Sequence, residues 1–362
     1  MKTKINSLYL SLLAGTLLTL GACSKNDDPQ PLPTGPEEIG FYFLNEGSNL
    51  NSSLDFLGFY NGSYTENAYS GTIGKGGNDM IIYGSKLYIT ATDANKVIVL
   101  DAASKEELEV INIALPRYLL GYRGKVYVTA HGENKVTVLD TTSFSTNDIP
   151  VGRSPEQLTA TGGKVYVTNS GWRDAATQGY DNRISVINPT TLTVEDNINV
   201  AENVQKIAAD TVKNVLYIGA SETFYGEKKP AKLYVYNTAN RQLSPMEFGI
   251  EDIAIVRISS SMTQAYMISS NYNGATKPTC LVMNLSNQTV QELTTGVSIQ
   301  TPYSIDFLPQ LGFIAVGDAK DYQSKGTMHF YQLYNDGRAT FSASQAVGVS
   351  PKAVAFNVNL KK

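Results

Sequence analysis

The stretch Gly163-Lys-Val-Tyr-Val-Thr-Asn169, followed after a polar loop by Arg183-Ile-Ser-Val-Ile-Asn188, decides the fold, because its pattern returns along the chain. Alternating Val, Tyr, Thr and Ile residues are typical of β-strands, and a glycine before the run suits a tight turn. The central aromatic residue recurs at intervals of 46, 39, 39, 51, 49 and 47 residues, as Tyr42, Tyr88, Tyr127, Tyr166, Tyr217, Tyr266 and Phe313. Repeats of roughly 40–50 residues are typical of four-stranded propeller blades.

Seven copies therefore predict an all-β, seven-bladed β-propeller of four-stranded antiparallel blades over residues 39–362. In the clearest unit we expect strands at 157–161, 164–169, 183–188 and 194–200. The first unit lacks a first strand, whereas residues 350–356 form a strand pattern with no partner after it. We predict that this C-terminal strand becomes the innermost strand of the first blade, which closes the ring and removes an open sheet edge.

The first 22 residues have the pattern of a lipoprotein signal peptide. Lys2 and Lys4 precede an apolar run over 8–20, which is too short for a membrane span. The run ends in Leu-Gly-Ala-Cys23, which resembles a bacterial lipobox and implies lipid attachment at Cys23. Residues 23–38 are polar and proline-rich, as in a flexible tether, and Asp27-Asp28 resembles the export tag of Bacteroidetes surface lipoproteins. We expect an outer-membrane protein that is anchored by lipid and faces the cell exterior.

Few residues point to catalysis or to a cofactor. The two histidines are His131, expected to be a solvated loop residue, and His329, within a strand. Asp318 and Asp321 are candidates for a cation, but aspartate is common in turns. No nucleophile elbow, phosphate loop or dinucleotide fingerprint stands in the required context. We expect no enzyme activity, no metal and no cofactor, and Cys280 is predicted to be a small buried residue.

Charge gives no reason to expect a nucleic-acid partner. The formal net charge is −4 over 362 residues, and it becomes −6 once Lys2 and Lys4 are removed with the signal peptide. A nucleic-acid-binding domain is expected to show a basic stripe, which this sequence lacks.

One face of the disc is the predicted binding site. Loops between second and third strands share a face with the links between blades, and four of these loops are long (170–182, 221–231, 271–279 and 318–327). The long loops carry the candidates Trp172, Arg173, Tyr180, Phe224, Tyr225, Tyr272 and Tyr322. The links into the first strands carry the candidates Asn78, Asp79, Arg117, Tyr118, Arg153, Gln205 and Tyr303. Aromatic rings beside amides and arginines favour a large amphipathic small molecule.

Three repeats contain a similar motif, as Tyr166-Val-Thr-Asn169, Tyr127-Val-Thr129 and Tyr88-Ile-Thr90. From Gly40 to the end, the chain resembles the YncE-like, YVTN-type propeller superfamily. A surface-tethered propeller with one aromatic face also resembles the BtuG-type lipoproteins of gut Bacteroidetes. That resemblance implies capture of cobalamin or other corrinoids and delivery to a TonB-dependent outer-membrane transporter. The alternatives are a glycan-binding lipoprotein, a protein–protein scaffold and a lactonase-like hydrolase, which would need converging carboxylates and a metal.

Overall fold

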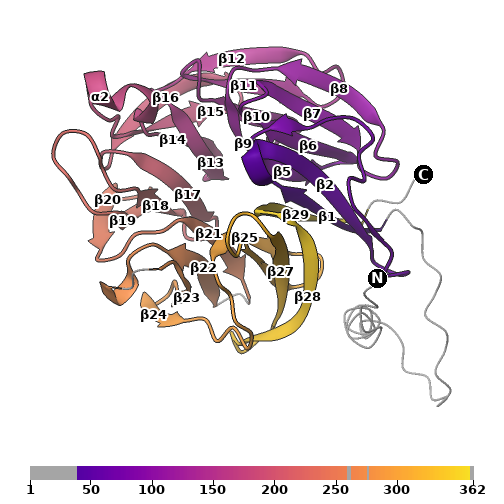
Figure 1. Cartoon of the computed structure of the whole chain (residues 1–362). Helices are drawn as coiled ribbons and strands as arrows, with labels where there is room; N and C mark the ends of the chain where they lie inside the picture. The colour runs from indigo at the N-terminus through magenta and orange to yellow at the C-terminus, as the bar shows by residue number, and fades with distance from the viewer. Residues whose placement is uncertain (1–38, 259–261, 275–276, 359–362) are drawn as a thin grey trace.

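The computed structural model describes residues 39–258, 262–274 and 277–358, which form seven sheets around a central axis (Figure 1). The predicted signal peptide, the lipid attachment at Cys23 and the tether lie outside the described residues. Within these ranges no helix has the length and apolar character needed to cross a membrane. The all-β, seven-bladed propeller predicted from the repeat is confirmed.

Each blade is an antiparallel sheet whose first strand lies nearest the axis. From the axis outward, blade 1 contains β29 (Pro351–Asn357), β1 (Gly40–Asn45), β2 (Asn51–Gly58) and β3 (Tyr64–Thr65), with β4 (Gly74–Lys75) also paired to β2. Blade 2 contains β5 (Gly77–Tyr83), β6 (Lys86–Ala91), β7 (Lys96–Asp101) and β8 (Glu107–Asn112). Blade 3 contains β9 (Pro116–Tyr122), β10 (Lys125–Ala130), β11 (Lys135–Asp140) and β12 (Thr146–Pro150).

The remaining four blades follow the same order. Blade 4 contains β13 (Pro155–Thr161), β14 (Lys164–Asn169), β15 (Arg183–Asn188) and β16 (Thr193–Asn199), and blade 5 contains β17 (Val204–Asp210), β18 (Val215–Ala220), β19 (Lys232–Asn237) and β20 (Gln242–Met246). Blade 6 contains β21 (Asp252–Arg257), β22 (Thr263–Ser269), β23 (Thr279–Asn284) and β24 (Thr289–Glu292), and blade 7 contains β25 (Pro302–Leu308), β26 (Phe313–Asp318), β27 (Lys325–Leu333) and β28 (Ala339–Val349). Short helical turns occur at η2 (Ser48–Leu50), η3 (Trp172–Asp174), α2 (Ala175–Gln178) and η4 (Tyr272–Gly274).

The two ends of the described chain meet in blade 1. β29 pairs with β1 in antiparallel register, with Phe41 opposite Phe356 and Gly40 opposite Asn357. The predicted ring closure by the C-terminal strand is therefore confirmed. The seam between blades 1 and 7 is rich in phenylalanine: the ring of Phe41 lies 4.8 Å from that of Phe356 and 5.2 Å from that of Phe330.

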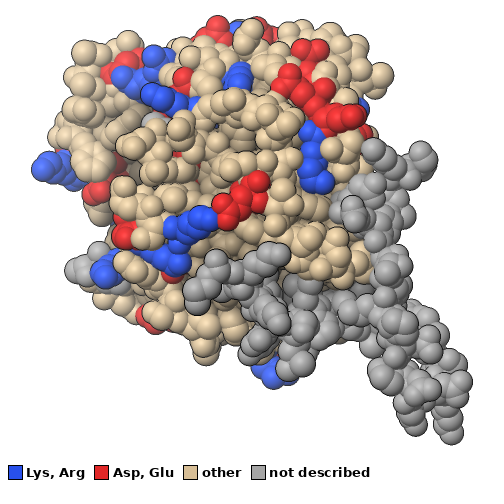
Figure 2. Space-filling model, turned by 45° about the vertical axis from the view of Figure 1, so that its right-hand side comes forward, with Lys and Arg blue, Asp and Glu red and all other residues tan. Residues whose placement is uncertain are grey.

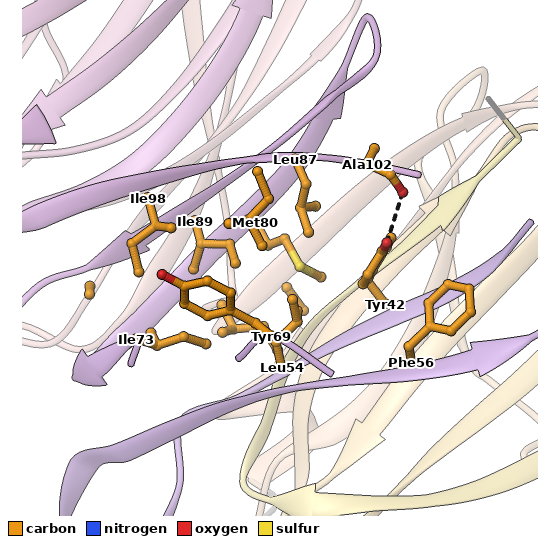
Figure 3. Packing of buried hydrophobic residues seen from close by; sticks show 14 residues of the cluster. Tyr42, Leu54, Phe56, Tyr69, Ile73, Met80, Leu87, Ile89, Ile98 and Ala102 are labelled. Carbon is orange, nitrogen blue, oxygen red and sulfur yellow. Dashed lines mark hydrogen bonds between the residues drawn. The ribbon is translucent and has the colours of Figure 1, made fainter. Parts of the chain in front are cut away.

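The recurring tyrosine packs between blades. Seven apolar clusters fill the seven interfaces, and Tyr42, Tyr88, Tyr127, Tyr217 and Tyr266 are among the largest fully buried side chains. Figure 3 shows the cluster between blades 1 and 2, where the Tyr42 hydroxyl donates a hydrogen bond of 2.8 Å to the Ala102 carbonyl. Adjacent strand residues point to opposite interfaces, which explains why the inner strands are apolar on both faces.

In blades 2 and 4 the threonine two residues after the tyrosine joins neighbouring blades. In blade 2 the pairing of β5 with β6 shifts between Gly77 and Asp79, which leaves the Asp79 amide facing a side chain. That amide donates to Thr90 Oγ1 (3.0 Å), and Thr90 Oγ1 donates to the Arg117 carbonyl of blade 3 (2.8 Å). Thr168 likewise donates to the Gln205 carbonyl of blade 5 (3.1 Å). Tyr-x-Thr occurs in blades 2, 3 and 4, where the tyrosine packs between blades, and in blades 2 and 4 the threonine also donates a hydrogen bond to the next blade.

We predict that Thr90→Val lowers the free energy of unfolding by about 1–3 kcal/mol. Valine keeps the shape of threonine but leaves the Asp79 amide without its partner and removes one of the two hydrogen bonds to the Arg117 carbonyl, which keeps that from Asn78. Urea unfolding followed by circular dichroism measures the change. Thr146→Val, on the exposed face of β12, is the matched control and should shift stability by less than about 0.5 kcal/mol. Equal effects of the two variants would contradict the assigned role of Thr90.

Candidate functional site

The connections between second and third strands and the links between blades share one side of the ring, which we call the loop face. Strand alternation places Gly40 and Asn357, which are opposite each other at the ends of β1 and β29, on the other side. All the sequence-predicted ligand-binding residues belong to these connections or to the first residues of the inner strands. The structure brings them together as one aromatic cluster, two aromatic pairs and the mouth of the central channel.

The aromatic cluster joins the long loops of blades 4 and 5. The rings of Trp172 and Phe224 are 5.8 Å apart and meet edge to face, and Tyr225 lies 6.4 Å from both Trp172 and Tyr180. The Tyr180 hydroxyl accepts a hydrogen bond from the Phe224 amide (2.9 Å). Trp172, Phe224 and Tyr225 are 40%, 55% and 47% exposed. Four contacting rings thus form a partly exposed apolar surface.

Two arginines predicted as ligand contacts, Arg153 and Arg173, form bonds that hold this loop in place. Arg153 forms an ion pair with Asp174 and donates to the Gly179 carbonyl (2.9 Å). Arg173 donates to the Gly132 carbonyl in the loop of blade 3 (3.0 Å). The buried Asp181 accepts the Arg153 amide (2.9 Å) and pairs with a further arginine in β15. These bonds fix the platform that carries Trp172 and Tyr180.

The remaining predicted aromatic residues form two pairs. Tyr272 packs edge to face on Phe248, in the link between blades 5 and 6, at 5.7 Å and is half-buried against the apolar cluster between these blades. Tyr322 is 46% exposed and lies edge to face on Tyr303 at 5.5 Å. The Tyr303 hydroxyl donates to Glu46 of blade 1. The Tyr303–Tyr322 pair therefore lies on the loop face close to the ring seam.

The seven inner strands surround a central channel along the axis of the ring. A cavity of about 250 Å³ lies in this channel and is lined mainly by the first residues of the inner strands. Of the predicted residues, Asn78, Asp79, Tyr118 and Tyr303 line it. Asn78 is buried and donates to the Arg117 carbonyl (2.7 Å), and Gln205 donates to Asn203 (2.9 Å). Sequence reasoning missed the lining residues Gln157, Lys206, Glu251, Asp252, Asp306 and Lys352. Aligning the inner strands of the blades by their pairing register would have found several of these residues. Gln157, Lys206 and Asp252 occupy the same position in their inner strands as Asp79 does in blade 2.

Carboxylates in the channel fasten neighbouring blades. Asp79 accepts the Leu119 amide of blade 3 (2.8 Å), and Asp252 accepts the Ile305 amide of blade 7 (3.0 Å). Asp306 accepts the Val354 amide of blade 1 (3.0 Å). In blade 4 the neutral amide of Gln157 makes the same kind of bond, accepting a blade 5 amide at 2.9 Å. The wall of the channel thus concentrates acidic groups for a structural reason.

Burial and mutual repulsion disfavour the charges on these acids. Burial raises the pKa of Asp79 to about 6 despite two backbone amides that favour the ionised form. The pKa of Asp306 is also raised, by burial and then by the charge of Asp252. Lys206 crosses the channel and donates to the Tyr118 hydroxyl (2.7 Å). Burial opposes the charge on Lys206, but Tyr118 and Asp252 outweigh burial, so the pKa of its ammonium group is raised.

A second cluster of charged and titratable side chains lies beside the mouth of the channel. Arg117 Nε donates to Glu156 (3.0 Å), and His131 Nδ1 lies 3.3 Å from the other oxygen of Glu156. The prediction that His131 is a solvated loop residue is wrong: it is only 6% exposed, because the loop of blade 3 folds it against β13. Burial lowers the pKa of His131, although Glu156 opposes that change. Cys280 is buried, as predicted.

The two aspartates considered for a cation are engaged with backbone amides. Asp318 accepts those of Gln300 (3.1 Å) and Thr301 (2.8 Å), and Asp321 accepts that of Ser324 (2.7 Å). Within the described ranges no group of three or more histidine, cysteine, aspartate or glutamate side chains is arranged to hold a metal ion. Figure 2 shows one face of the molecule, on which acidic and basic side chains are interspersed.

Comparison with known proteins supports the fold alone. No family model and no curated protein matches the sequence. Among solved structures, a "putative 6-phosphogluconolactonase" from Bacteroides fragilis is similar with a TM-score of 0.60 at 11% identity, covering 91% of this chain and all of the other. A protein of the same description from Bacteroides uniformis has a TM-score of 0.59 at 11% identity, covering 88% and 100%. Hydrazine synthase from Kuenenia stuttgartiensis has a TM-score of 0.59 at 14% identity, covering 75% and 86%.

We predict that Asp79→Asn gains stability relative to the unchanged protein as the pH rises from 4 to 7.5. The pKa of Asp79 is about 6 in the folded chain and near 4 when unfolded, so the folded state binds the extra proton only below about pH 6. The penalty for ionising Asp79 therefore grows through this range, to at most about 3 kcal/mol. Asparagine removes the penalty and keeps an oxygen for the Leu119 amide. Thermal melting of both proteins across the range measures the difference.

Asp140→Asn is the control, for which we expect the opposite dependence of stability on pH. Backbone amides of Ser143 and Thr142 lower the pKa of this exposed carboxyl. Its ionised form stabilises the fold near neutral pH, and that stabilisation is lost as the pH falls through its folded-state pKa. Asp140→Asn should therefore be most destabilising near pH 7. The same trend with pH for both variants would contradict the assignment for Asp79.

Proposed function

We propose that the protein is a lipid-anchored receptor on the exterior of the outer membrane that captures cobalamin or a related corrinoid on its loop face. It then passes the ligand to a TonB-dependent transporter without chemical change. The observation that carries the proposal is the exposed cluster of Trp172, Tyr180, Phe224 and Tyr225. The YncE-like and BtuG-type resemblance agrees with it and is part of the proposal.

The shape of the face favours a large flat ligand over a small one. The channel cavity of about 250 Å³ is below the roughly 300–1,000 Å³ typical of pockets for drug-sized molecules. A larger ligand must therefore lie across the face, in contact with the aromatic cluster. A corrinoid offers an apolar macrocycle for stacking and peripheral amides for hydrogen bonds. Gln157 at the channel mouth and Gln205 beside it are partly exposed, and the hydrogen bonds described above use only one atom of each side-chain amide, so the other atom can bind a peripheral amide of the ligand.

Rigidity of the platform supports high affinity. The ion pair of Arg153 with Asp174 and the hydrogen bond from Arg173 hold the blade 4 loop before any ligand arrives. Ordering a loop during binding costs free energy, so a loop that is already ordered binds more tightly. Aromatic side chains add contact area and lose little conformational entropy.

The tether has enough length for delivery to a neighbouring transporter. β1 begins at Gly40 on the side opposite the loop face, so the proposed tether joins the ring on that side. Sixteen residues, 23–38, span at most about 55 Å when extended. This reach allows the loop face to turn towards a partner embedded in the same membrane.

We predict that the purified protein retains cyanocobalamin through desalting and that Trp172→Ala/Tyr225→Ala weakens binding at least tenfold. The variant removes two rings of the cluster, and central aromatic residues typically contribute more than 1 kcal/mol each. Titration calorimetry measures the affinity. Tyr334→Ala, a 44% exposed tyrosine in a turn on the opposite side, is the control and should bind normally. Colourless eluted protein, or equal binding by both variants, would overturn the corrinoid proposal.

Lactone hydrolysis is the second candidate, favoured by the Arg117–Glu156–His131 group beside the channel mouth. The lowered pKa of His131 keeps its ring neutral near pH 7, as a general base requires. However, the side chains of Glu156 and His131 are only 4% and 8% exposed, which leaves little access for a substrate.

We therefore predict that the protein and its His131→Gln variant hydrolyse a sugar δ-lactone at the same background rate, followed with a pH indicator. Loss of a general base typically lowers a catalysed rate by 10²–10⁴-fold. A lactonase rate that falls at least a hundredfold in the variant would replace the receptor proposal with a hydrolase.

A further inference from the structure

Blade 1 departs from the pattern of the other six at its outer strand. The outermost strands of blades 2 to 7 contain 4 to 11 residues, whereas β3 contains two. β3 pairs with Phe56 and Leu57 at one end of β2, and β4 pairs with Asn51 and Ser52 at the other. Residues 66–73 connect the two pieces and leave the middle of β2 without a regular outer strand. The repeat does not require this interruption.

A cavity of about 490 Å³ lies between the middle of β2 and this connection, at the outer end of the blade. Its volume is within the range of pockets that hold small molecules. Leu54, Tyr69 and Ile73 line it and are almost fully buried, as part of the cluster between blades 1 and 2 that Figure 3 shows. The cavity thus has an apolar floor built on the core of the propeller.

The connection that forms the cavity is held at several points. The Asn67 amide donates to Asp55 (3.0 Å), and the Ala68 amide donates to the Leu54 carbonyl (2.6 Å). The Tyr69 hydroxyl donates to Glu107 of blade 2, and Lys96 donates to the Thr72 carbonyl (2.8 Å). These bonds and the buried Tyr69 and Ile73 side chains make the cavity a preformed feature.

The chemistry of the lining selects a neutral, hydroxylated ligand. The lining contains no acidic or basic side chain, and its polar members are asparagine, serine and threonine, with Asn51, Asn67, Ser70 and Thr72 exposed. Among the described residues, no hydrogen bond uses these four side chains. Amides and hydroxyls both donate and accept, as sugar hydroxyls do, and the apolar floor suits the C–H face of a sugar ring.

We propose that this cavity, which we call the rim pocket, is a binding site for a sugar residue and is separate from the loop face. Asn51 and Thr72 contact the sugar hydroxyls from opposite walls, and Tyr69 and Ile73 contact its apolar face. The pocket gives the receptor a second point of attachment, to carbohydrate at the cell surface or in the medium. The site rests on the interrupted outer strand of blade 1 and not on the corrinoid proposal.

The test is ligand-observed saturation-transfer NMR with the purified protein and a panel of neutral monosaccharides and disaccharides. Each is used at about 10 mM, high enough to reveal a Kd of about 1 mM. We expect at least one sugar to bind, and Asn51→Ala/Thr72→Ala to weaken it about tenfold through loss of two hydrogen bonds. Asn147→Ala/Thr146→Ala makes the same chemical changes on the exposed outer strand of blade 3 and should bind the sugar normally.

Ser70→Trp, which places a large ring at the exposed wall of the pocket, should block binding without disturbing the core. Absence of binding by every sugar in the panel would overturn the proposal. Binding that survives in Asn51→Ala/Thr72→Ala and is lost in Trp172→Ala/Tyr225→Ala would also overturn it, because the sugar would then occupy the loop face. Cyanocobalamin binding by the same variants is measured separately, so failure of the rim pocket and failure of the corrinoid proposal are distinguishable.

Discussion

The pairing of β1 with β29 is the constraint on which the rest of the molecule depends. It joins residues more than 300 positions apart, so the conformational entropy lost in this pairing is offset only when the intervening chain packs into its blades. A single blade cannot bury both of its faces, and only a closed ring covers all fourteen. The phenylalanines at the blade 1–blade 7 seam and the buried Asp55, which accepts the Gly348 amide of blade 7 (3.1 Å), secure this last interface. Without closure, two unpaired sheet faces would meet water.

Closure also dictates the character of the channel. Inner strands converge at the axis, and their amides at the bulges need acceptors there, which Asp79, Asp252, Asp306 and the amide of Gln157 provide. Acids that fasten the blades are thus crowded into a narrow space with Lys206 as a counter-ion. The channel is acidic because of how the ring is held together, and its 250 Å³ is too small for a large ligand. Specific binding must therefore come from features that the ring does not require.

The sequence predicted the parts of the structure that repeat. The strands at Lys164–Asn169 and Arg183–Asn188 were predicted to the residue, because period-two alternation and glycine turns are local signals. The roles of Arg153 and Arg173 and the burial of His131 were not predictable in the same way, since each depends on a neighbouring blade. A long side chain in a loop has the same local pattern whether it contacts a ligand or a carbonyl of the next loop. The interrupted outer strand of blade 1 was missed because two-residue strands carry no periodicity.

Departures from the repeat are the best guide to function in such a fold. The recurring tyrosines, the threonines Thr90 and Thr168, and the channel acids have structural partners that account for them. Trp172, Phe224 and Tyr225 do not: they occur in only two blades, and exposing about half of each ring to water gives the propeller no stability. The same reasoning applies to the gap between β3 and β4, since a continuous outer strand would pair more of β2. We therefore place both proposed sites where the seven-fold pattern is broken, because the features there cost stability in one or two blades and are absent from the others.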